Sequence, residues 1–383
     1  MTSQSNILPG HLAPLTSLRF IAALFIYIHH LWGKFDIPHI SAYGLYFGVG
    51  VPFFFALSGF ILSYKYPPPS NLSESARMIL YRIARIWPLH AACLLIFIIL
   101  LGDFDHPLQN PKMILPNILL IQSWLGMFPY SFSFNAVSWS LSNELFFYIL
   151  FPFFLGMTNR SLIIVACASS FVAMMWATAS WEAGTRIVNP VVSGLAITVT
   201  HPLSSLPIFI AGIFTARAFR RYRDRFENIH LVNVLEIVAV CLFVIYMVFN
   251  REISAAVNST IGANAPVSRW VLPILGIAAF VPAIFIFAVG RGLISTILSS
   301  SPLVFLGNIS FSFYLVHQPI INYLNNTTSL KSPEGIIASL GLSIIISVVL
   351  FKAVELPAQR MLRGLVDGAL KPAQLPVQPR HLS

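Results

Sequence analysis

Charged residues are scarce in this sequence of 383 residues: Asp, Glu, Lys and Arg make up 9% of it, whereas hydrophobic residues make up 57%. A soluble domain typically carries about 25% charged residues. The shortage of charge therefore excludes an ordinary soluble globular protein. Apolar stretches of about 18 residues or more, long enough to cross the hydrocarbon core of a bilayer, recur along the chain. We expect an all-α fold, a polytopic bundle of transmembrane helices.

Cysteine is also rare, because the chain has only Cys93, Cys167 and Cys241, each in an apolar segment and none in CxxC spacing. This pattern excludes a disulfide framework and a structural zinc site, and no metal site is predicted. The first apolar segment lacks a signal-peptidase cleavage site, so we expect it to be retained as a span. The chain shows no internal repeat and no appended soluble domain.

We predict about ten spans, with the N- and C-termini both cytoplasmic. The spans lie near residues 15–33, 46–64, 86–102, 141–157, 161–180, 203–219, 232–249, 270–289, 303–324 and 335–355. With this placement, fifteen Lys and Arg residues fall in cytoplasmic segments and six in external ones, as the positive-inside rule requires. The net charge of +10 is therefore a topology signal, and no nucleic acid partner is expected.

Residues 1–365 form the predicted transmembrane domain, and residues 366–383 form a predicted disordered cytoplasmic tail, because they are largely polar and contain proline. The longest external loop, near residues 103–140, has apolar clusters that are too short and too often broken by proline to span. It lies at the membrane interface or re-enters the membrane.

Three ionisable side chains, Arg19, His29 and His30, interrupt the first span. Lipid cannot offset their desolvation, so they should face a polar interior. At about 100° and 1.5 Å per residue, His30 lies about 20° around the helix from Arg19 and about 16 Å along its axis. His29 lies about 80° away. Arg19 and His30 could contact the two ends of one elongated ligand. Their spacing alone fits equally well a snorkelling arginine and a structural histidine.

Five segments, in order, resemble acyltransferase family 3, the membrane O-acyltransferases typified by bacterial O-antigen acetylases. The first is the Arg-x10-His spacing of Arg19 and His30. The others are FGVGVPFFFALSGF, YRIARIWPLH with Arg82 and Arg85, NAVSWSLSNELFFYILFP, and LGNISFSFYLVHQPI. The resemblance extends from about residue 14 to residue 360. It implies that the protein is an acyltransferase.

The resemblance implies that Arg19 helps to hold an acyl donor and that His30 is the catalytic histidine. An imidazole is suited to take a proton from a sugar hydroxyl near neutral pH, and it could less readily serve as a transient acyl carrier. Arg82 and Arg85 share a helix face and are expected to bind the phosphates of a coenzyme A donor. The alternative for this pair is anchoring at the membrane surface through lipid headgroups.

Glu144 is the lone carboxylate of the fourth segment, because Leu145 stands where the family often has a second acid. A carboxylate inside a membrane helix is a functional candidate. Glu144 is expected to act in catalysis by orienting His30 or by binding the acceptor, and its alternative is a structural pairing with an arginine. Near the end of the chain, Lys352 and Glu355 could pair at i,i+3. The expected supporting residues of the cavity are Asn135, Trp139, Ser140, Tyr148 and His317.

The predicted function is membrane-bound O-acyl transfer, with acetyl the preferred group, from cytoplasmic acyl-CoA to a hydroxyl of a surface or exported glycan. Acyl-CoA is a co-substrate, and no tightly bound cofactor is expected. The other predicted partners are a carbohydrate acceptor, such as O-antigen or exopolysaccharide, and the lipid bilayer. The predicted location is the bacterial inner (plasma) membrane.

Two alternatives stay open. One is a transporter or flippase for a lipid or glycan, which the absence of visible inverted repeats disfavours. The other is a non-catalytic membrane subunit of a polysaccharide assembly complex, in which Arg19 and His30 have only structural roles.

Overall fold

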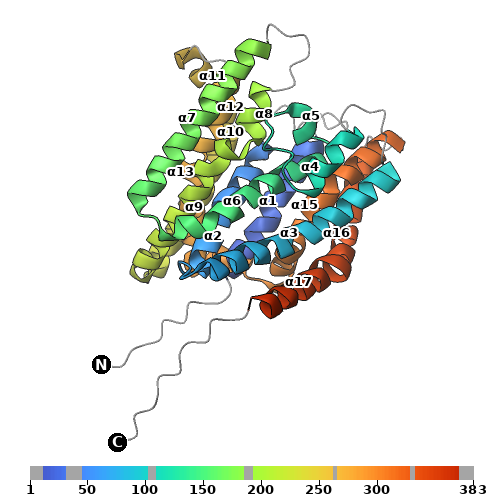
Figure 1. Ribbon diagram of the computed structural model, residues 1–383. Coiled ribbons are helices and arrows are strands. Elements are labelled where there is room, and N and C mark those ends of the chain that lie inside the picture. Colours follow the sequence, from blue (N-terminus) through green and yellow to red (C-terminus); the bar gives the residue numbers. More distant parts are fainter. Residues whose placement is uncertain are drawn as a thin grey trace, which may run out of the picture.

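The computed structural model of the protein describes residues 12–31, 45–101, 109–184, 193–261, 265–327 and 333–370. These residues form helices and connecting segments, and no strand occurs among them (Figure 1). The α-helices are α1 (Ala13–Leu31), α2 (Gly50–Lys65), α3 (Leu72–Leu101), α4 (Ile114–Ile118), α5 (Phe128–Ser131), α6 (Trp139–Gly156), α7 (Asn159–Gly184), α8 (Gly194–Thr200), α9 (Pro202–Tyr222), α10 (Ile229–Val248), α11 (Asn250–Ile261), α12 (Ala265–Leu275), α13 (Ile277–Val289), α14 (Leu293–Leu298), α15 (Ser301–Thr327), α16 (Pro333–Leu350) and α17 (Leu356–Ala369). Short 3₁₀ helices occupy Phe47–Val49, Pro111–Met113, Ala136–Ser138 and Arg223–Arg225, and a π-helical turn, Phe351–Glu355, joins α16 to α17.

Within the described ranges, nine helices are long and apolar enough to cross a membrane. This confirms the all-helical polytopic fold, and nine of the ten expected segments coincide with these helices. The tenth, 141–157, lies in α6, which has 18 residues and is helical as expected. Asn143 and Glu144 in its first turns lower its mean hydropathy, so α6 is not among the nine.

Close helix contact in the centre of the bundle depends on two glycines. A Cβ atom added at Gly59 of α2 would lie 2.0 Å from the backbone oxygen of Phe209 in α9. One added at Gly212 of α9 would lie 1.9 Å from the backbone oxygen of Ala56. Small residues let membrane helices approach in this way. Gly59 of the FGVGVPFFFALSGF segment therefore has a packing role.

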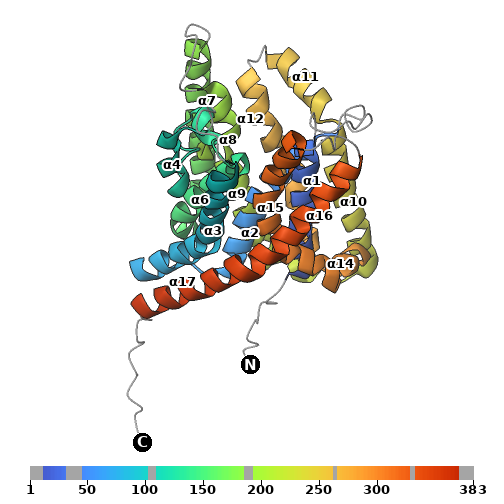
Figure 2. The same ribbon diagram turned by 90° about the vertical axis from the view of Figure 1, so that its right-hand side faces the viewer.

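Helix α1 packs along α15, which lies next to it in both views (Figures 1 and 2). A Cβ atom at Gly307 of α15 would lie 2.1 Å from the backbone oxygen of Thr16, so the two backbones nearly touch at one end. Further along, the rings of Phe20 and Tyr27 pack on Phe313, with centroids 5.3 and 5.9 Å apart. This contact fixes which side of α1 faces α15, and thus where its ionisable side chains point.

The segment before α6 packs against the bundle through buried polar side chains. The Asn117 Nδ2 group donates a hydrogen bond to Ser133 Oγ at 2.7 Å, and Ser123 Oγ donates one to Asn143 Oδ1 at 2.8 Å. All four residues are fully or almost fully buried. As predicted, the segment is not a span. Its buried contacts favour the re-entrant alternative over an interfacial position.

At the opposite end of the molecule from α11 and α12, α17 lies beside the first turns of α3 (Figure 2). Arg77 of α3 forms an ion pair with Asp367 of α17 at 3.8 Å. Helix α17 extends to Ala369, so residues 366–369 are helical and not part of a disordered tail. Residues 371–383 lie outside the described residues.

Candidate active site

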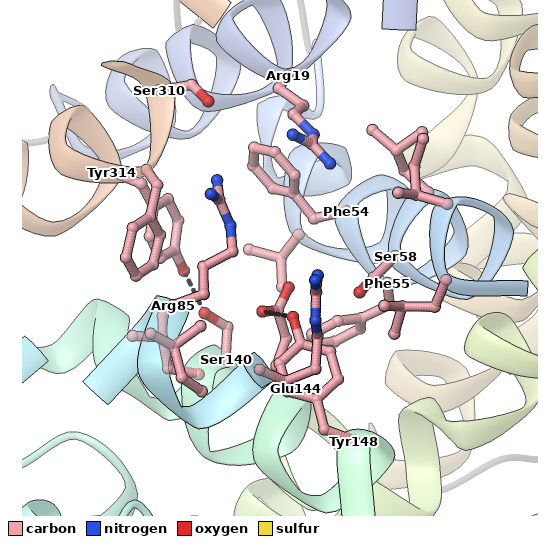
Figure 3. Close-up of a pocket in the computed structure, with 18 residues that line it drawn as sticks. Arg19, Phe54, Phe55, Ser58, Arg85, Ser140, Glu144, Tyr148, Ser310 and Tyr314 are labelled. Carbon is pink, nitrogen blue, oxygen red and sulfur yellow. Dashed lines mark hydrogen bonds between the residues drawn. The ribbon is translucent and has the colours of Figure 1, made fainter. Parts of the chain in front are cut away.

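A polar cavity of about 90 Å³ lies between α1, α2, α3, α6 and α15. Three guanidinium groups line it: Arg19 from α1, and Arg82 and Arg85 from α3. Their polar neighbours are Ser58, Ser140, Glu144, Tyr148, Ser310 and Tyr314 (Figure 3). The spacing of the two α3 arginines puts both side chains on the cavity side, as predicted. An anionic ligand is the natural occupant of such a cavity, because positive charge exceeds negative charge in its lining.

Glu355 holds Arg85 from outside the cavity lining. Its Oε1 atom lies 3.8 Å from Arg85 Nη1, and its Oε2 atom accepts a hydrogen bond of 2.8 Å from Ser312. The Glu355 side chain is 1% exposed and belongs to the π-helical turn. The alternative pairing with Lys352 is not formed, because Lys352 is exposed while Glu355 points inward.

Glu144 lies among the arginines. Its Oε2 atom accepts a hydrogen bond of 2.5 Å from Tyr148, one helical turn away, and both residues line the cavity (Figure 3). The expectation that Glu144 orients His30 is not met, because His30 does not line this cavity. The position of Glu144 fits instead a carboxylate that balances part of the arginine charge.

His30 contacts His317 of α15. The His30 Nδ1 and His317 Nε2 atoms are 2.9 Å apart, and the two rings stack with centroids 5.1 Å apart. The His317 Nδ1 atom lies 3.2 Å from the backbone oxygen of Phe313. His317 is 0% exposed, whereas His30 is half-buried, so the pair is shielded from water on the His317 side.

The hydrogen-bond partners determine the tautomers of a neutral pair. A backbone carbonyl only accepts, so His317 Nδ1 must carry the proton that it donates to Phe313. His317 Nε2 is then an acceptor, and His30 Nδ1 must donate to it. In this neutral tautomer, the proton of His30 is therefore on Nδ1.

Tyr314 separates the histidine pair from the arginine cavity. It lines the cavity, its ring centroid is 5.8 Å from that of His317, and its hydroxyl is 2.8 Å from Ser140 Oγ (Figure 3). The single cavity expected from the sequence is thus divided. A rise of about 16 Å along α1 separates Arg19 from His30, and this leaves room for an aromatic side chain between them.

Two of the expected supporting residues serve the packing. Asn135 donates a hydrogen bond of 2.8 Å to the backbone oxygen of Leu315, and the Trp139 ring packs edge-on against Phe55 with centroids 6.1 Å apart. Neither lines the cavity, whereas Ser140 and Tyr148 do. Asn135 thus supports α15 next to the histidine pair.

Sequence reasoning missed Glu355 and Tyr314 as site residues. Tyr314 stands in the LGNISFSFYLVHQPI segment and Glu355 was considered only as a partner of Lys352, but each is a polar side chain in an otherwise apolar stretch. A search for every such residue could have found them.

Comparison with known proteins shows the family to which this protein belongs. The acyltransferase domain of acyltransferase family 3 matches residues 14–352, and the chain belongs to this family. It is therefore a membrane acyltransferase. Acyltransferase MdmB from Streptomyces mycarofaciens is 26% identical to it over an alignment of 388 positions, which covers 92% of each chain. No solved structure matches. The family and the enzyme class expected from the sequence are thus confirmed.

Proposed function

We propose that this acyltransferase moves an acyl group, acetyl by preference, from acyl-CoA to a hydroxyl of a surface or exported carbohydrate. One observation carries the proposal: α1 has an arginine-lined cavity at Arg19 and a hydrogen-bonded histidine pair at His30. The first suits an anionic donor, and the second suits removal of a proton from an acceptor hydroxyl.

The predicted topology gives the two ends of α1 their roles. The positive-inside rule assigns the Arg19 end to the cytoplasm, where acyl-CoA is made, and the His30 end to the opposite side, where surface glycans are modified. In this proposal, the membrane is the bacterial inner membrane. The donor binds with its phosphates at Arg19, Arg82 and Arg85, and its thioester extends along α1 toward His30.

In the proposed reaction, His30 Nε2 takes the proton of the acceptor hydroxyl as the hydroxyl oxygen attacks the thioester carbonyl carbon. The carbon–oxygen ester bond forms, the carbon–sulfur bond breaks, and the proton passes from His30 to the thiolate of coenzyme A. His317 accepts the Nδ1–H of His30 throughout, so the base keeps its orientation. Tyr314 has to move aside for the thioester to reach His30.

Stabilisation of the oxyanion is best assigned to Ser140 and Tyr314. Their hydroxyl groups lie 2.8 Å apart at the boundary between the cavity and the histidine pair, where the thioester carbonyl would pass. Donors positioned in this way stabilise a tetrahedral intermediate. Both hydroxyl groups also lie 3.0 Å from the backbone oxygen of Val137, so each has to turn its proton from Val137 toward the oxyanion.

Two experiments test the proposal. Mass spectrometry of surface glycans from the source organism, with and without the gene, should show an acyl group that disappears on deletion. The purified protein should then transfer acetyl from acetyl-CoA to that glycan. If it moved a lipid or glycan across vesicles without acyl transfer, the transporter alternative would replace this proposal.

A further inference from the structure

A group of cations surrounds Tyr66 just beyond the arginine cavity. Lys65 Nζ lies 5.8 Å from the centre of the Tyr66 ring, and the Arg82 guanidinium carbon lies 5.5 Å from it. Arg82 also donates a hydrogen bond of 3.1 Å to the Tyr66 hydroxyl. Because Arg82 lines the cavity as well, Tyr66 lies directly next to the cavity.

Arg363 of α17 adds a further charge to this group. Its guanidinium carbon lies 5.4 Å from the centre of the Tyr81 ring, and it is close enough to Arg82, Arg85 and Lys65 to repel them. Helix α17 is held beside α3 by the ion pair of Arg77 with Asp367. The last helix thus brings a cation to a site formed mostly by α2 and α3.

These cations have little negative charge near them. Among the described residues, no carboxylate lies within 4 Å of Lys65, Arg82 or Arg363. In addition, the Nε atoms of Arg82 and Arg363 are buried without a hydrogen-bond partner. Clustered cations that lack counter-charges are unfavourable in a partly desolvated site, so the site is suited to a bound polyanion.

Counting the cavity and the Tyr66 group together, five cations face two carboxylates. The cations are Lys65, Arg19, Arg82, Arg85 and Arg363, and the carboxylates are Glu144 and Glu355. The single phosphodiester of a carrier-protein phosphopantetheine would neutralise one charge of this excess. A nucleotide thioester with a diphosphate and a 3′-phosphate carries several negative charges and so fits better.

We propose that Lys65, Tyr66 and Arg363 form an outer subsite for the nucleotide end of the donor, with Arg82 joining it to the cavity. The ring of Tyr66 holds Lys65 and Arg82 in place, and Lys65 and Arg363 bind the phosphates. The inference rests on the proposed function and deepens it. It selects a 3′-phosphorylated nucleotide thioester over a carrier-protein thioester as the donor.

The test is equilibrium binding of three probes to the full-length protein in nanodiscs of zwitterionic lipid: coenzyme A, 3′-dephospho-coenzyme A and 4′-phosphopantetheine. The wild type should bind coenzyme A at least about tenfold more tightly than 4′-phosphopantetheine, with the 3′-dephospho form between them. Lys65→Ala and Arg363→Ala should each weaken coenzyme A binding by about tenfold and leave 4′-phosphopantetheine binding unchanged.

Matched variants separate the subsite from general charge. Arg360→Ala removes an exposed arginine of the same helix and should change nothing. Tyr66→Phe keeps the ring and should bind coenzyme A almost as the wild type does, whereas Tyr66→Leu should bind it more weakly. Because Lys65 is exposed, Lys65→Ala provides the test even if Arg363→Ala fails to fold.

Several results would overturn the inference. Equal binding of coenzyme A and 4′-phosphopantetheine by the wild type would do so. Equal effects of Arg363→Ala and Arg360→Ala would indicate cations that serve lipid headgroups. Failure of the wild type to bind coenzyme A at all would overturn the proposed donor, and the subsite with it. Binding of coenzyme A that is insensitive to Lys65, Tyr66 and Arg363 would remove the subsite alone.

Discussion

The two ends of helix α1 differ in charge and in access. At Arg19, three guanidinium groups and Glu144 line a cavity of about 90 Å³. At His30, the contact is between two stacked imidazoles, and its inner partner, His317, is completely buried. A cation beside His30 would repel the imidazolium that forms when it takes a proton. Separation along one helix therefore lets the protein bind an anionic donor without weakening its base.

Removal of the proposed base, His30, should give the largest decrease in the rate of acyl transfer. His30→Ala should lower the rate of acyl transfer by about 10²–10⁴-fold, because general base catalysis is lost, and should leave coenzyme A binding unchanged. The rate is measured on the acceptor glycan and the binding on the purified variant. His29→Ala is the control and should retain most activity. Full activity of His30→Ala together with loss of activity in His29→Ala would show that His29, on another face of α1, is the catalytic base.

The partner of the base should give the next largest effect. His317→Ala removes the acceptor that fixes the tautomer of His30, and the transfer rate should fall by about 10²-fold. His317→Gln can place an oxygen near the position of Nε2, so it should retain more activity than His317→Asn, whose amide is shorter. Donor affinity should be the same in all three variants. Equal activity of the Gln and Asn variants would contradict the orienting role.

A substitution in the arginine cavity should weaken donor binding and leave the rate of the chemical step unchanged. Arg85→Ala should weaken coenzyme A binding by about 10–100-fold, and Arg85→Lys by less, because lysine keeps the charge but loses the bidentate geometry. At saturating donor, the transfer rate should be close to that of the wild type. Lost turnover with unchanged donor affinity would mean that Arg85 acts on the reacting atoms.

Glu355→Gln should give the smallest effect. The amide can still accept the hydrogen bond from Ser312, but the ion pair with Arg85 is lost. Since Arg85 is partly exposed, we expect coenzyme A affinity to change by no more than about fivefold. Titration of the purified variant measures this. A loss of coenzyme A affinity as large as that of Arg85→Ala would contradict this limited role of Glu355.

Helix geometry predicted the local part of the site. The three-residue spacing of Arg82 and Arg85 put both on the cavity side, and the small angle between Arg19 and His30 put both against α15. Angles around a helix carry no information on what fills the space along it, so Tyr314 was not foreseen there. The pairing of Arg85 with Glu355 could not be predicted from the sequence either, because it depends on how distant helices pack around a π-helical turn.

The polar residues of α6, the tenth expected span, are explained only by the packed structure. Asn143 and Glu144 lie in an otherwise apolar segment, and their cost in lipid depends on the neighbours that α6 meets after folding. In the structure, Asn143 accepts a hydrogen bond from Ser123, and Glu144 accepts one from Tyr148. Tertiary partners thus decide how polar such a helix can be.

The most direct test of the account measures both functions in one variant. Purified His30→Ala should bind coenzyme A with the affinity of the wild type, while a deletion strain complemented with the same variant should carry no acyl group on its surface glycan. Loss of coenzyme A binding in His30→Ala, or an acylated glycan in the complemented strain, would contradict the division of binding and chemistry between the two ends of α1.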